Sequence, residues 1–77
     1  MASDQSMIFA WGDSVKLKRP EVKVKYGLSQ GSVCGFREID SSDLAENLKV
    51  PLGTVLVLVE GANGLSVEIP ESELEPL

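Results

Sequence analysis

Residues 14–18 alternate between apolar and polar side chains. A period of two is typical of a half-buried β-strand. Pro20 interrupts the pattern, because proline has no N–H to donate to a strand ladder. The alternation resumes over 22–26, so the chain is predicted to stay extended there, and the composition of 27–31 indicates a loop.

Three further strand signals follow. Residues 31–39 read as a second strand, and Gly35 within it indicates a bulge or a close backbone approach. Residues 54–60 are apolar and β-branched almost throughout, as in a strand that is buried on both faces or covered by an oligomer partner. The Asn-Gly pair of 61–64 favours a hairpin turn, so the alternating residues 65–69 are predicted to return beside the preceding strand.

One short helix is predicted near residues 42–49. Asp43 followed by Glu46 fits the capping box of a helix start, and Leu44 and Leu48 have helical spacing. A proline and a glycine end this helix after about two turns. We expect its leucines to cover one end of the fold and to face the core.

A terminal helical turn is predicted near 70–74, with Pro70 at the first helical position and acidic residues in the first turn. Residues 75–77 then add a last short edge. These elements predict an all-β fold, a small five-stranded barrel, because closure hides strand edges. We expect residues 7–77 to form this single domain and residues 1–6 to be a flexible tail.

The composition removes most catalytic chemistry. The chain has 77 residues and no histidine, which excludes His acid–base groups, His-activated nucleophiles and His metal ligands. Its one cysteine, Cys34, allows neither an internal disulfide nor a cysteine metal cluster, and such cysteines are usually small buried side chains. The carboxylates stand in capping and turn positions. We therefore predict a protein that is not an enzyme and holds no cofactor or metal.

Charge is unevenly distributed along a chain of net charge −5, which is a poor general ligand for nucleic acid. Five cations fall within ten residues, whereas no basic residue follows Lys49. The basic run is interpreted either as a solvated face that pairs with glutamates across the fold or as a loop patch for a protein partner. The candidate partner-binding residues are Trp11, Lys16, Lys18, Arg19, Lys23, Lys25 and Tyr26.

The longest apolar run, Val55–Val59, is strand-sized and too short to span a membrane. The N-terminal residues lack the basic start of a secretory signal. With a lone cysteine, these features predict a cytoplasmic protein without a membrane partner.

Three motifs occur in an order that resembles SH3-like barrels: Gly12-Asp13-x-Val15-x-Leu17, Gly31-x-Val33-x-Gly35 and Val67-x-Ile69-Pro70-x-x-x-Leu74-Glu75. The resemblance covers nearly all of the chain after residue 11. It implies a fold that hosts many functions. Because the first long loop of such barrels often forms part of a ligand groove, it also implies a binding role for Tyr26 with Lys23 and Lys25.

Residues 15–21, Tyr26 and residues 31–33 are similar to the start of the photosystem I PsaE subunit. That family provides docking platforms in electron-transfer complexes. The resemblance ends at about Val33, and it implies protein docking.

Residues 66–70, followed by Leu74-Glu75, are similar to the end of the R-plasmid type II dihydrofolate reductase, a homotetramer around a central pore. Glu68 and Pro70 stand where that motif has Gln and Tyr. The carboxylate of Glu68 cannot donate the hydrogen bond that the amide NH2 of a glutamine donates. The resemblance therefore implies a shared mode of assembly without that activity.

Residues 43–54 resemble the Leu-Ala-x-x-Leu-x-Val-Pro stretch of helix-turn-helix regulators. Those proteins need a second helix that enters the DNA groove, and a strand is predicted to follow here. DNA binding is therefore disfavoured.

Two functions stay open. The first is a non-catalytic protein–protein adaptor or accessory subunit that uses the basic loop patch. The alternative is a homo-oligomeric barrel that binds a small ligand at a subunit interface or pore, because the apolar strand at 55–59 would need cover. Trp11 either plugs one end of the fold or stands exposed as an anchor.

Overall fold

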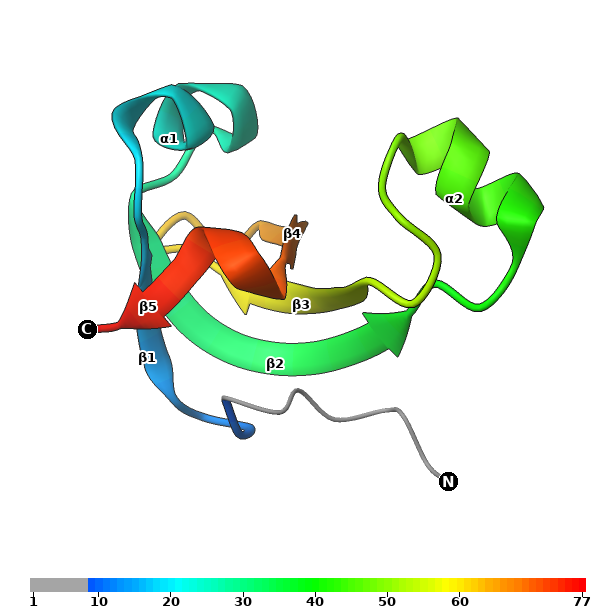
Figure 1. The fold of residues 1–77 in the computed structure, drawn as a ribbon. Coiled ribbons are helices and arrows are strands. Elements are labelled where there is room, and N and C mark those ends of the chain that lie inside the picture. The colour runs from blue at the N-terminus through cyan, green and yellow to red at the C-terminus, as the bar shows by residue number, and fades with distance from the viewer. Residues whose placement is uncertain (1–8) are drawn as a thin grey trace.

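The computed structural model describes residues 9–77, in which the alternating segments form one antiparallel sheet of five strands (Figure 1). The order across the sheet is β4-β3-β2-β1-β5. The predicted strands are confirmed as β1 (Ser14–Leu17), β2 (Gln30–Glu38), β3 (Val55–Glu60), β4 (Ser66–Pro70) and β5 (Leu74–Pro76). The predicted tail at 1–6 lies outside the described residues.

The sheet curls along β2 but does not close. The first part of β2 pairs with β1, through Ser32 opposite Ser14, and the rest pairs with β3, through Glu38 opposite Val55. The register shifts between Val33 and Gly35, which confirms the predicted bulge. Within residues 9–77, β4 and β5 remain edges of an open sheet. The fold is thus a small, mostly-β domain, and a closed barrel is not shown.

The hydrophobic core lies inside this curl. Its members come from alternate strand positions, as a period of two requires. The buried side chains of the cluster are Phe9, Val15, Leu17, Val22, Val33, Val57, Val59, Ile69 and Leu74. Fully burying one such aliphatic side chain stabilises a fold by about 1.5–3 kcal/mol.

The predicted extended segment at 22–26 is wrong, because the chain forms a helix, α1 (Pro20–Tyr26). Pro20 stands in its first turn, where the missing N–H costs nothing. Glu21 in the first turn and Lys25 in the last complement the helix dipole. Gly27 ends the helix in the left-handed conformation, with its N–H donating to the carbonyl of Lys23.

The side chains of α1 confirm why alternation misled the prediction. Val22 is buried and Tyr26, four residues later, packs against the core, so these two positions share one helix face. Val24, the middle member of the alternation, is 83% exposed. The apolar positions therefore serve a helix with a narrow buried stripe and not a two-sided strand.

The predicted central helix is confirmed as α2 (Ser42–Leu48), although its details differ. Ser41, and not Asp43, caps it, because the Ser41 hydroxyl accepts the N–H of Leu44. The helix buries no residue, Leu48 is 42% exposed, and neither Leu44 nor Leu48 joins the core cluster, so the expectation that its leucines face the core is wrong. No helix in the described part of the chain has the length and apolar character needed to cross a membrane.

The predicted terminal turn is confirmed as a short 3₁₀ helix, η1 (Glu71–Glu73). Pro70 precedes it as the N-cap instead of occupying the first helical position. The backbone N–H of Lys18 donates to the carbonyl of Glu73, which fixes η1 against the start of α1.

The apolar strand β3 is covered on both faces by the chain itself. One face contributes to the core. On the other, Arg37 of β2 and Glu68 of β4 form an ion pair of 2.8 Å across β3. Their register partners are Leu56 and Leu58, and Leu56 is only 4% exposed. The predicted burial of both faces is therefore largely met without an oligomer partner.

Candidate functional site

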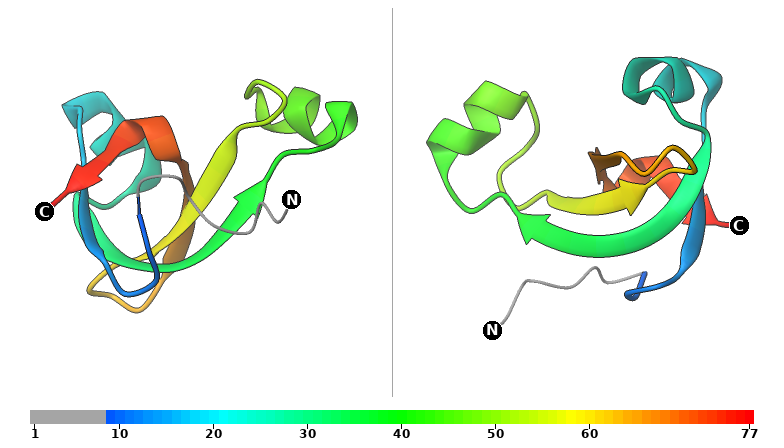
Figure 2. Two further views of the ribbon diagram at one scale, coloured as in Figure 1. Left: turned by 60° about the horizontal axis from the view of Figure 1, so that its bottom comes forward. Right: turned by 180° about the vertical axis from the view of Figure 1, so that it is seen from behind.

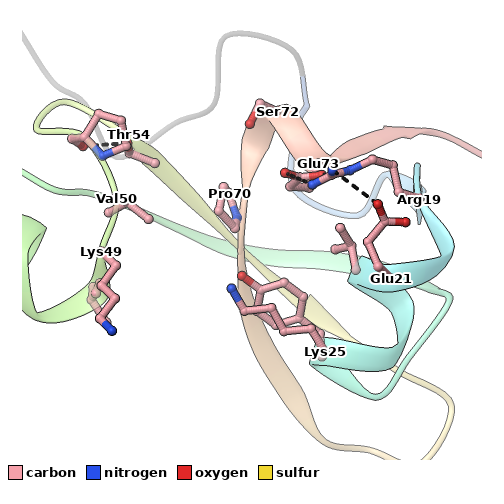
Figure 3. A pocket seen from close by; sticks show the side chains of 13 residues that line it. Arg19, Glu21, Lys25, Lys49, Val50, Thr54, Pro70, Ser72 and Glu73 are labelled. Carbon is pink, nitrogen blue, oxygen red and sulfur yellow. Dashed lines mark hydrogen bonds and ion pairs between the residues drawn. The ribbon is translucent and has the colours of Figure 1, made fainter.

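A groove of about 610 Å³ lies between α1 and α2. Both helices stand on the same side of the sheet with a space between them, and this holds in each view (Figure 2). One wall comes from α1, the opposite wall from the end of α2 and the segment after it, and Pro70 and Ser72 lie between the walls (Figure 3).

The apolar surface of the groove comes from side chains that are far apart in the sequence. Tyr26 belongs to α1, Leu48 and Val50 to the opposite wall, and Pro70 to the end of β4. The same four residues also line an adjoining depression of about 240 Å³, which extends the apolar surface to Leu56. Binding sites for small molecules are commonly concave and mostly apolar. This groove is concave but mixed in character, because charged side chains line it beside the apolar ones: Arg19, Glu21, Lys25, Lys49 and Glu73.

One end of the groove is held by a network of charges. The Arg19 guanidinium donates from Nε to Glu73 Oε1 at 3.1 Å and from Nη2 to Oε2 at 2.8 Å, and Nη1 lies 3.4 Å from Glu21 Oε2 (Figure 3). The hydrogen bond with Glu73, together with its negative charge, raises the pKa of Arg19 above the ordinary value. This two-point contact joins the start of α1 to η1, and the positive charge of Arg19 is matched by carboxylates of the protein itself.

The other end of the groove carries two lysines. Lys25 extends from α1 into the space between the helices, and its Nζ lies 5.3 Å from the centre of the Tyr26 ring, within cation–π range (Figure 3). Lys49 lies on the opposite wall. Neither ammonium group forms an ion pair with any residue of the described part of the chain.

Lys49 also has an uncommon backbone conformation. It caps α2 with φ 57° and ψ 44°, in the left-handed region, and is the only non-glycine residue in 9–77 with positive φ. Its N–H donates to the carbonyls of Ala45 and Glu46, which holds the turn in place. A side chain in this conformation costs about 1 kcal/mol, and such costs gather at functional sites.

The structure divides the seven predicted partner-binding residues. Three of them, Arg19, Lys25 and Tyr26, line the groove. Lys16 instead pairs with Glu75 at 3.8 Å, and Lys18 and Lys23 do not line the groove. The pairs made by Lys16 and Arg19 show that part of the basic run is matched by glutamates across the fold.

Trp11 is 70% exposed at the opposite end of β1 from α1, so it does not plug the fold. Its turn is well fixed: Asp13 Oδ2 accepts the Ala10 N–H, and the Gly12 N–H donates to the carbonyl of Val33. The indole is therefore presented away from the groove, as an exposed side chain on an ordered turn.

The groove residues that the sequence did not predict include Leu48, Lys49, Val50 and Pro70. In the sequence, Lys49 stands between the last turn of a predicted helix and a proline. This pattern does not indicate a residue with left-handed backbone conformation. Cys34, the bulged residue of β2, is half-buried, with Sγ 3.9 Å from Ser66 Oγ. Residues 9–77 contain no group of three or more carboxylates and cysteines arranged to hold a metal ion.

The chain matches no protein-family model, and neither a curated protein nor a solved structure is significantly similar to it. The geometry and charges of the groove are therefore the features that indicate a function.

Proposed function

We propose that the protein is a non-catalytic binding module that takes an extended segment of a protein partner in the groove between α1 and α2. The observation that carries this proposal is the joint placement around one open groove of four apolar side chains and of two lysines that form no ion pair in the described part of the chain. A groove open to solvent suits a chain segment, whose backbone continues beyond the site at both ends.

An SH3-like arrangement is part of the proposal. Its support is the order of the elements: a long excursion between β1 and β2, a hairpin from β3 to β4, and a 3₁₀ turn before β5. In such folds the first long loop often contributes to a ligand groove, and α1 occupies that loop here. The sheet also curls along β2, which is compatible with such an arrangement (Figure 1).

The alternative, a homo-oligomer that binds a small ligand, was motivated by an apolar strand in need of cover. The Arg37–Glu68 ion pair and the core already cover β3 in the single chain. That observation therefore no longer favours assembly. Light scattering at high micromolar concentration distinguishes the two functions, and we expect a monomer.

The test uses two matched leucines. Leu48 lines the groove and is 42% exposed, whereas Leu52 is 61% exposed and lies outside it. We expect immobilised wild-type protein and Leu52→Glu to capture the same protein from host lysate, and Leu48→Glu to lose it. Equal capture by both variants would contradict a site in the groove. Circular dichroism checks that both variants are folded.

A further inference from the structure

The two ends of the groove differ in charge, and this difference bears on the ligand. At one end, Arg19 is shared between Glu73 and Glu21, so acidic charge is in excess there. At the other end, Lys25 and Lys49 have no acidic partner in the described residues. The groove is therefore positive at one end only.

Glu68 also borders the lysine end, where it lines the smaller depression with Lys25. Its carboxylate is engaged by Arg37 at 2.8 Å on the far side of β3. Glu68 therefore does not neutralise the two lysines, and an anion placed between them would meet two ammonium groups that form no ion pair within residues 9–77.

The net charge of −5 does not cancel this local attraction. At physiological ionic strength the Debye length is about 8 Å, so exposed charges farther away are largely screened. Lys25 and Lys49 line the same groove from its two walls, so an acidic group bound in the groove faces these two charges first. An apolar surface beside the site lowers the local dielectric and strengthens the attraction.

The apolar part of the groove lies next to the lysines. Leu48 immediately precedes Lys49, Val50 follows it, and Tyr26 supports Lys25 through its ring. A ligand that places a carboxylate between the lysines therefore brings its neighbouring groups over Leu48, Val50 and Pro70.

We infer that the groove selects partner segments in which an Asp or Glu adjoins a large apolar side chain. This inference rests on the proposed function, since it names the chemistry of the segment that the groove takes. The carboxylate lies between Lys25 and Lys49, and the apolar side chain packs on Leu48, Val50 and Pro70. The acidic excess near Glu21 repels a second carboxylate, so the segment runs in one direction along the groove.

The probe is a displayed library of random octapeptides. An extended chain advances about 3.3 Å per residue, so eight residues span about 26 Å. The molecule measures 31 × 25 × 20 Å along its principal axes, so this length crosses the whole groove. We expect selection on the wild-type protein to enrich an acidic residue beside Leu, Ile, Met or an aromatic residue.

The key variant combines Lys25→Gln with Lys49→Gly. Glycine accepts the left-handed backbone of position 49 at no steric cost, so this variant removes both charges without straining the fold. The matched control is Lys18→Gln, which removes an exposed lysine outside the groove. Fluorescence anisotropy then compares a selected peptide with its own Glu→Gln version.

We expect the wild-type protein and Lys18→Gln to prefer the Glu peptide about tenfold, the size expected for one charged contact. The double variant should bind both versions equally, and added salt should weaken only the Glu version on the wild type. A selection without binders, binders without acidic enrichment, or an unchanged preference in the double variant would overturn the inference. Binders that lack acids but are lost in Leu48→Glu would leave the proposed function standing, whereas binders retained by Leu48→Glu would count against it.

Discussion

The close approach of β2 to β3 at Gly31 gives a sharp test of the packing. A Cβ added to Gly31 would overlap the carbonyl oxygen of Glu60 and lie 2.7 Å from Cγ1 of Val59. Val59 is fully buried, so its side chain has no open space to enter. The backbone of Gly31 lies outside the left-handed region, and the absence of a Cβ is therefore what this position requires.

The cost of Gly31→Ala follows from these contacts. Overpacking a filled site costs about 1–3 kcal/mol, because side chains or backbone must shift. For a domain of this size, 1 kcal/mol lowers Tm by about 4–8 °C. A cost of about 2 kcal/mol therefore lowers the Tm of Gly31→Ala by about 8–16 °C.

Thermal unfolding followed by circular dichroism measures this difference, with Gly35→Ala as the matched control in the same strand. A Cβ at Gly35 would meet Leu58 at 3.4 Å, an ordinary contact. Because alanine also reduces the entropy of the unfolded chain, Gly35→Ala should have a Tm equal to or slightly above that of the wild type. Similar Tm values for the two variants would refute the close approach of β2 and β3.

Three further predictions concern α1 and the ion pairs. Val24→Ala should leave Tm unchanged or raise it slightly, because Val24 is 83% exposed on a helix and alanine is the better helix former by up to about 0.7 kcal/mol; a clear fall in Tm would favour an extended segment. A double-mutant cycle of Arg37→Ala and Glu68→Ala, measured as free energies of unfolding, should give a coupling energy of about 0.2–1 kcal/mol that decreases with added salt, because the pair is half-exposed. A coupling energy of zero at low salt would contradict the ion pair. Glu73 raises the pKa of Arg19, so the stabilisation of the fold by the Arg19–Glu73 pair is present below the ordinary arginine pKa and is lost only as pH rises through the raised value. The Tm difference between the wild type and Arg19→Gln should therefore be equal at about pH 7 and about pH 10. A Tm difference that disappears over this interval would contradict the pairing.

The positions of the strands could be predicted because their signals are local. A period of two, the Asn-Gly turn at 63–64 and the proline before η1 each act over a few residues. The exception was α1, where the same residues satisfied two patterns. Pro20, Glu21 and Gly27 together carried a helix signal that the alternation of 22–26 obscured.

By itself, the sequence determined the strands, the hairpin and the central helix, and it limited the available chemistry by lacking histidine. Only the tertiary structure decided which charges within residues 9–77 form ion pairs and which do not. Glu73 reaches Arg19 because η1 packs beside the start of α1, while Lys25 and Lys49 come to opposite walls of one groove. Lys25 and Lys49 are far apart along the chain, and the curl of β2 and the register of the sheet bring them to the same groove. The curl and the register depend on contacts between distant strands, so the residues next to either lysine do not predict them.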